Sequence, residues 1–421
     1  MEYHRGSDPY FSQFNVILMS IAVIVPALMW FMRGPKGRRA YIAPGQWPIL
    51  GHAAYFNEKE ILQFNEKMIL KARFQSGEPD FECFVLGKRY LFISNWEVVS
   101  ELLRQRPVKF RRDRSFESWA NEFRLNNGLF NAEDPEWGRI RRLTAPSFAT
   151  PSVKAIAPEI FSQTNVLITD LKSRIVAASS TGGIIDGLVP CKQFTTSVIF
   201  AMAFGSTVHS FEYVSSGQLL KDLDLLLLWM FRRSVNPFPM WIHNLLNAEV
   251  EGAFLPMKAR MQALIELVLE REQNVTDEEG AKNTIFLHML RTASLKEVGG
   301  RSSLNHDELV AQVYTTLIAG SETTSVTMEC ALWVLGQDQY SKLQAELQAE
   351  VDQLLTGPGT SCILQDVEQV DALPLLNAMV METLRLYGPG RILFLQTANY
   401  RDVQLPCDYV LSPNVSKIRI N

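Results

Sequence analysis

Hydrophobic and polar positions recur with a helical period along most of the chain, and this period predicts long amphipathic helices. A different pattern occupies residues 81–94, where Phe, Val, Tyr and Ile flank Gly87, and it predicts a β-hairpin. We therefore expect a mainly α-helical protein with a small β subdomain, of the α+β class. The helical segments fall at residues 58–71, 96–104, 152–204, 219–246, 249–271, 305–335, 341–355 and from 373 onward.

One of these segments, residues 305–335, holds almost no charge and also carries the most unusual residues. Asn305 followed by Glu308 predicts a capping box that opens the helix. At its centre stands Ala-Gly-Ser-Glu-Thr-Thr (residues 319–324), with weaker helix formers than a purely structural helix needs. Ala319 and Gly320 predict a bare groove for a flat or small group. Glu322 and Thr323 then supply a carboxylate and a hydroxyl, a pair suited to passing protons through an apolar cavity.

A purely structural interpretation of this helix remains open. Gly320 then permits a close helix crossing, the hydroxyl groups bond back to carbonyl groups one turn earlier, and Glu322 meets a basic partner elsewhere in the chain.

The N-terminal segment indicates a membrane anchor. Residues 11–32 contain no charge, and about 20 apolar residues cross a hydrocarbon layer of about 30 Å. Arg33, Lys36, Arg38 and Arg39 follow at once, which places the main domain on the cytosolic side. A cleavable signal peptide is the alternative, but the apolar part is long for one. We expect an N-terminal tail and transmembrane anchor over residues 1–34 and one domain over residues 35–421.

Composition excludes several other classes. The net charge is −4, from 41 basic and 45 acidic residues, so nucleic acid is not an expected partner. The five cysteines are scattered without Cys-x-x-Cys spacing, which argues against a disulfide scaffold or a zinc site. A reducing compartment fits this usage.

Two further pairs of residues stand at helical spacing. Trp137 and Arg141 lie four apart, so an indole N–H and a guanidinium face a common anion. A solvated basic face with a partly buried Trp137 is the alternative. Glu382 and Arg385 lie three apart, and their apolar neighbours predict a partly buried ion pair.

Taken together and in this order, these motifs resemble those of the cytochrome P-450 family, the haem-thiolate monooxygenases of the membrane-anchored eukaryotic type. The resemblance runs from residue 44 to 406 and includes the proline-rich segment after the anchor. It implies a haem cofactor, with Trp137 and Arg141 gripping a propionate. Ala319 and Gly320 then form the groove over the distal haem face.

The resemblance also assigns roles to the two carboxylates. Glu322 and Thr323 become the acid–alcohol pair that delivers protons during the activation of dioxygen. Glu382 and Arg385 become a structural pair that supports the core on the haem side. The implied activity is hydroxylation of a lipophilic small molecule, with electrons from an NADPH-dependent reductase. The implied location is the endoplasmic reticulum membrane, in a single pass.

One part of the family pattern is not found in the 421 residues. The axial ligand of the family is a cysteine in a Phe-x-x-Gly-x-Arg-x-Cys-x-Gly loop, and Cys407 has neither the glycines nor the Phe of that loop. We therefore assign no metal ligand and expect a C-terminally truncated P-450 domain without its haem-ligand region. The truncation has three possible sources: an error in the gene model, alternative splicing or an early stop.

Two interpretations of the function follow. The complete product is a monooxygenase, or the chain as given is a non-catalytic, membrane-anchored helical protein without thiolate-ligated haem. A lumenal binding protein is a third possibility, for which glycans at Asn274 and Asn414 are the mark.

Overall fold

The structure is a computed structural model, and its description covers fifteen stretches of the chain. These are residues 40–47, 50–57, 59–86, 88–106, 110–112, 119–179, 185–204, 212–273, 286, 304–356, 367–390, 393–397, 403–404, 410–411 and 415–420.

The chain divides into two compact units, each built from segments distant in sequence. The first, here called the sheet unit, comprises Met1–Phe116, Phe231–Asn247 and Arg391–Asn421. The second, here called the helical unit, comprises Glu117–Met230 and Ala248–Gly390. The single domain expected over residues 35–421 stays a prediction.

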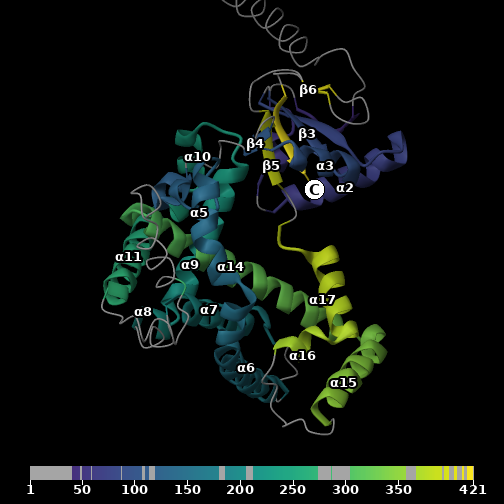
Figure 1. Cartoon of the computed structure of the whole chain (residues 1–421). Helices are drawn as coiled ribbons and strands as arrows, with labels where there is room; N and C mark the ends of the chain where they lie inside the picture. The colour runs from purple at the N-terminus through teal and green to yellow at the C-terminus, as the bar shows by residue number, and fades with distance from the viewer. Residues whose placement is uncertain are drawn as a thin grey trace, which may run out of the picture. The chain divides into compact units, whose positions relative to one another are not determined.

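The sheet unit is built around a six-stranded sheet within the described residues, in the order β1-β2-β3-β8-β5-β4 (Figure 1). The predicted hairpin is confirmed, because β2 and β3 pair antiparallel with Phe81 opposite Phe92. β8 lies parallel to β3, so the last strand of the chain completes a sheet begun near its start. The strands are β1 Tyr41–Ile42, β2 Phe81–Val85, β3 Lys88–Ile93, β4 Phe110–Arg112, β5 Leu393–Thr397, β6 Val403–Gln404, β7 Val410–Leu411 and β8 Val415–Ile420.

In two helices of the sheet unit, the residue next to the helix explains where the helix ends or begins. α2 (Ile61–Ser76) ends at Gly77, whose φ of +80° suits a residue without a side chain. α3 (Trp96–Arg104) matches its predicted bounds, because the Asn95 side chain accepts hydrogen bonds from the first-turn backbone N–H groups. The core beneath α2 contains stacked Phe81 and Phe92, whose ring centres lie 4.4 Å apart.

The remaining helices follow the predicted order. The patterns at residues 152–204 and 219–246 each form two helices. The bounds are α5 Glu136–Thr144, α6 Thr150–Ser179, α7 Leu188–Phe204, α8 Glu212–Ser215, α9 Gln218–Val235, α10 Met240–Leu246, α11 Ala248–Gln273, α14 His306–Leu335, α15 Ser341–Thr356, α16 Val367–Asp371 and α17 Pro374–Tyr387. Of these helices, α8 and α16 are additional to the predicted segments.

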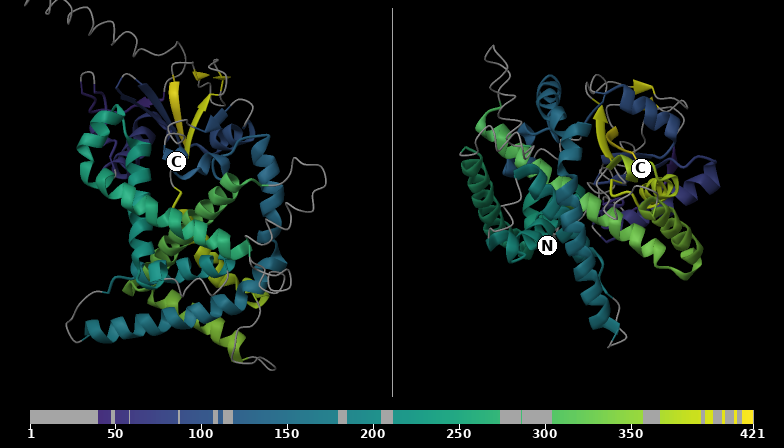
Figure 2. Two further views of the ribbon diagram at one scale, coloured as in Figure 1. Left: turned by 90° about the vertical axis from the view of Figure 1, so that its left-hand side faces the viewer. Right: turned by 60° about the horizontal axis from the view of Figure 1, so that its bottom comes forward.

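Helix α14 organises the helical unit, where α7 runs along it and α17 packs near its C-terminal end (Figures 1 and 2). The predicted capping box is present: Asn305 Oδ1 accepts from Glu308 N at 2.9 Å, and Glu308 Oε2 accepts from Asn305 N at 2.8 Å. A loop also packs on its first half, where a Cβ at Gly128 would lie 3.1 Å from Ala311 Cβ.

Four aromatic rings form the centre of the helical unit. Trp229 stacks on Phe254 with ring centres 4.0 Å apart, and Phe123 meets Tyr314 edge-on at 5.1 Å. These rings come from α9, α11, α14 and a short loop helix, so their contacts hold the helices together. The expectation of a mainly α-helical protein with a small β part is confirmed.

The predicted transmembrane anchor lies outside the described residues. Within the part of the chain that the structure describes, no helix has both the length and the apolar character needed to span a membrane.

Candidate functional site

The centre of α14 has two different faces. Ser321 and Ser325 are buried, whereas Ala319 and Thr323, four residues apart, are exposed. Residues four apart share one face of a helix. A small apolar surface and a hydroxyl group therefore lie together on the exposed face.

Gly320 lies against helix α7 and not on this exposed face. A Cβ atom built on Gly320 would lie 2.5 Å from Cδ1 and 2.6 Å from Cγ1 of Ile199. Such distances are far below van der Waals contact, so any larger residue here would force the Ile199 side chain to move, and glycine allows the two helices to approach this closely. Thr195 strengthens the same contact, since its hydroxyl donates to the carbonyl oxygen of Ser321 at 2.8 Å.

The hydroxyl groups near Glu322 bond back to the helix. Ser321 Oγ donates to Leu317 O at 2.7 Å, Thr323 Oγ1 to Ala319 O at 2.7 Å, and Thr327 Oγ1 to Thr323 O at 2.9 Å. This local bonding is common for Ser and Thr in helices. The close crossing at Gly320 and these hydrogen bonds agree with the structural interpretation of the helix. The catalytic role of Glu322 and Thr323 stays a prediction.

Glu322 lies beside a lysine that sequence reasoning did not identify. Lys192 Nζ of α7 lies 3.1 Å from Glu322 Oε1 and also pairs with Asp224 of α9. Only 16% of the Glu322 side chain is exposed, whereas 53% of the Asp224 side chain is. The three side chains therefore join a mostly buried carboxylate to the surface.

This arrangement raises the pKa of both Glu322 and Lys192. Burial raises the pKa of the Glu322 carboxyl, Lys192 lowers it in part, and the negative charge of Asp224 raises it. Burial lowers the pKa of Lys192, but its hydrogen bonds to Asp224 and Glu322 outweigh burial and leave the pKa raised. Glu322 is thus poised to take up a proton more readily than an exposed carboxylate.

The predicted anion-binding pair on α5 is exposed. The helix begins at Glu136 with Pro135 at its N-cap position. Trp137 is 40% exposed and Arg141 is exposed. Both side chains therefore present their donors on the surface of the helical unit, where an anion can reach them.

Ion pairs fix α5 to the start of α14. Arg139 donates to Glu308 of the capping box and, at 2.8 Å, to Glu136. Glu308 precedes Ala319 by eleven residues, which is about 16 Å along a helix. The α5 pair and the exposed face of α14 thus belong to one connected framework.

Glu382 and Arg385 form the expected ion pair on α17. Two parallel hydrogen bonds join them, at 2.6 and 2.7 Å. Their side chains are 55% and 66% exposed, so the expectation of partial burial is wrong. The pair lies on an exposed part of α17, where the apolar residues Met381 and Leu384 are exposed as well.

The described residues fit part of a haem. Trp137 and Arg141 offer donors for a propionate, and the Ala319–Thr323 face offers a small surface with one hydroxyl. Two of the described cysteines, Cys83 and Cys191, do not fit the iron, because both are fully buried and burial raises the pKa of Cys191 to about 11. Among the described residues no cluster of His, Cys, Asp or Glu could hold a metal ion.

Sequence reasoning missed Lys192, Asp224 and a small cavity beside α14. One signal was available, since Lys192 is the single charged residue of α7. The cavity has a volume of about 280 Å³ and is lined by Phe123, Arg124 and Tyr314 among others. Burial raises the pKa of Tyr314, and its hydroxyl has no hydrogen-bond partner among the described groups.

Comparison with known proteins now gives the family. The Cytochrome P450 family model matches residues 43–419. Cytochrome P450 3A29 of Sus scrofa is 29% identical over 276 residues, 62% of this chain and 50% of that protein. A bifunctional cytochrome P450/NADPH--P450 reductase of Fusarium oxysporum is 24% identical over 359 residues, 82% of this chain and 30% of that protein.

A solved structure shows the same fold. The crystal structure of the cytochrome P450DA heme domain matches with a TM-score of 0.69 and 19% identity, covering 91% of this chain and 77% of that one. The chain spans about half the length of the first curated relatives that it matches. The match of the family model over most of the chain shows that the chain belongs to the cytochrome P450 family.

Proposed function

We propose that this protein serves a haem-dependent monooxygenase reaction, in which a lipophilic small molecule is hydroxylated with dioxygen and electrons from an NADPH-dependent reductase. One observation carries the proposal: Ala319 and Thr323 are exposed on one face of a helix whose preceding turns, from Val310 to Leu317, are mostly buried. Family membership supports the haem, and the relative fused to a reductase supports the electron donor.

The residues of this chain take the following roles. Haem would supply the oxygen chemistry when bound. Trp137 and Arg141 would hold its propionate, and Ala319 would leave room for its ring. Thr323 holds a proton at its Oγ1 atom, and Glu322 replenishes that proton from solvent through Lys192 and Asp224. Support for the last role comes from the ion pairs that join Glu322 to an exposed carboxylate.

We also propose that the protein is attached to the endoplasmic reticulum membrane by residues 11–32, with its main domain in the cytosol. The support is the uncharged run and the basic residues that follow it. A lipophilic substrate fits this location, since such molecules concentrate in membranes.

The test of the proton-delivery role is Thr323→Ala. The purified chain carrying haem is combined with a reductase, NADPH and a fatty acid as probe, and product formed per NADPH consumed is measured. We expect the variant to lower this ratio about tenfold or more, because proton transfer by a positioned group contributes at least about that much. Thr327→Ala is the matched control, since Thr327 also bonds back one turn and we expect its ratio to be unchanged.

An unchanged ratio in Thr323→Ala would remove this residue from the proton path. Absence of oxidised product in the parent chain would contradict the monooxygenase proposal for these 421 residues.

We keep a second candidate, a non-catalytic membrane-anchored helical protein. The observation behind it is the burial of Cys83 and Cys191, which does not suit either thiol to ligate iron. The reduced, carbon-monoxide-bound absorption spectrum separates the two candidates. A thiolate-type spectrum would reject the second candidate, and its absence from haem-loaded protein would favour it.

A further inference from the structure

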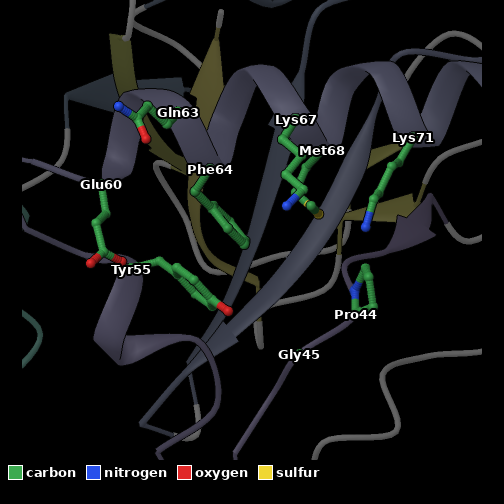
Figure 3. A pocket seen from close by; sticks show the side chains of 9 residues that line it. All are labelled: Pro44, Gly45, Tyr55, Glu60, Gln63, Phe64, Lys67, Met68 and Lys71. Atoms are coloured by element: carbon green, nitrogen blue, oxygen red, sulfur yellow. The ribbon is translucent and has the colours of Figure 1, made fainter.

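A groove in the sheet unit carries positive charge that no function described above uses. Figure 3 shows it between α2 and the loop at Pro44 and Gly45. Its volume is about 460 Å³, within the about 300–1,000 Å³ of small-molecule sites. The groove therefore has room for a small ligand. It is lined by Pro44, Gly45, Tyr55, Glu60, Gln63, Phe64, Lys67, Met68 and Lys71.

Two lysines dominate one end of the groove. Lys67 and Lys71 lie one helical turn apart, and both side chains point from α2 toward the loop that contains Pro44 (Figure 3). Within the described stretches of chain, neither ammonium group has a carboxylate at ion-pair distance. Glu60 lies toward the other end of the groove, so the lysine end is locally positive.

The floor of the groove is apolar and firmly held. The Tyr55 ring stacks on Phe64 with centres 4.7 Å apart, and Phe64 and Met68 are buried in the core of the sheet unit. Gly45 has a φ of +90°, and a Cβ there would lie 3.3 Å from the Tyr55 hydroxyl. A glycine thus allows both the turn of the loop and the position of Tyr55.

We propose that this groove binds the phosphate-bearing headgroup of an anionic phospholipid. Lys67 and Lys71 contact the phosphodiester, and Phe64 and Met68 contact the glycerol and the first acyl carbons. Charge complementarity selects an anionic over a zwitterionic headgroup. The choice of a lipid rests on the proposed membrane attachment: the groove begins at residue 44, shortly after the apolar run and its basic cluster. Basic residues next to an anchor are drawn to anionic lipid surfaces.

The test uses the full chain in neutral detergent and a short-chain lipid, dihexanoylphosphatidylglycerol, below its micelle concentration. Binding is measured by calorimetry for the parent protein and for Lys67→Gln/Lys71→Gln. We expect the double variant to bind about thirtyfold more weakly, equivalent to about 2 kcal/mol, since each substitution removes a charge-assisted hydrogen bond to the phosphodiester. Lys59→Gln/Lys221→Gln is the matched control, because both lysines are exposed outside the groove and we expect affinity within about twofold of the parent.

Two comparison ligands decide the source of the phosphate. Dihexanoylphosphatidylcholine tests the need for net negative charge, and inorganic phosphate tests the need for the lipid. We expect both to bind at least about tenfold more weakly than phosphatidylglycerol. Phosphatidylcholine carries an additional cation in its headgroup, and inorganic phosphate lacks the apolar contacts. Equal binding of inorganic phosphate would overturn the lipid assignment.

Equal affinity of the Lys67→Gln/Lys71→Gln variant and its parent would overturn the groove as the site. Failure of phosphatidylglycerol to bind the parent protein would overturn the whole proposal. Haem takes no part in this experiment. A negative result would therefore overturn the lipid-binding proposal and leave the monooxygenase proposal unaffected.

Discussion

The two halves of α14 differ although they form one continuous helix. In the first half, Val310 to Leu317 are mostly buried, and Arg124 pairs with Asp307 at 2.5 Å while Arg139 pairs with Glu308. In the second half, Ser321 and Ser325 are buried, whereas Leu332 is 47% and Trp333 58% exposed. Packing against neighbouring elements therefore accounts for the residues found in the first half. The candidate haem surface, the exposed Ala319–Thr323 face, lies where the two halves meet, and its side chains are available to a ligand.

The sharpest contrast between the halves is between two aromatic residues. Tyr314 is 1% exposed and Trp333 is 58% exposed. We expect Tyr314→Ala to lower the free energy of unfolding by about 3–5 kcal/mol, because it leaves a cavity in the aromatic cluster. Trp333→Ala is the control and should cost less than about 1 kcal/mol. Urea denaturation measures both, and equal losses would contradict the contrast.

A second prediction concerns the crossing of α14 and α7. Gly320→Ala forces Ile199 to move and should destabilise the protein by about 1–3 kcal/mol, despite the better helix propensity of alanine. The double variant Gly320→Ala/Ile199→Ala should recover part of that loss. A single variant as stable as the parent would show that the close crossing does not require glycine.

The start of α14 gives a smaller effect. Asn305→Ala removes the side-chain half of the capping box and should cost about 1 kcal/mol. Asn305→Ser keeps a capping oxygen and should retain most of the stability. Thermal unfolding distinguishes the two, and equal melting temperatures would count against the cap.

The difference in predictability between these regions has a physical cause. The capping box, the bounds of α3 and the hairpin of β2 and β3 depend on neighbours in sequence, and the pattern predicted them. The pairing of β3 with β8 joins residues more than 300 positions apart, and no local pattern encodes it.

The same limit applies to the candidate site. The sequence indicated a basic partner for Glu322 only as an alternative, and the identity of Lys192 depends on how α7 packs against α14. The exposure of Glu382 and Arg385 likewise depends on which elements cover α17.

The smallest expected effect is a change in the pH dependence of stability. Burial raises the pKa of Glu322 above its ordinary value of 4.5, so the folded protein binds more protons than the unfolded chain just above that pH. Stability attributable to this group is therefore greatest at low pH and falls as the pH rises through the raised pKa. Glu322→Gln should flatten this fall, with Glu329→Gln as a control on the same helix. If the stability of Glu322→Gln had the same pH dependence as that of the parent, the raised pKa of Glu322 would be contradicted.

We propose that α5 and the exposed face of α14 together bind haem, and a titration of the purified full chain with haem, followed by its Soret absorption, measures this binding. We expect one haem per chain and about tenfold weaker binding for Arg141→Ala, equivalent to about 1.4 kcal/mol, with Arg142→Ala unchanged. Equal affinity in Arg141→Ala, or binding without a defined stoichiometry, would contradict it.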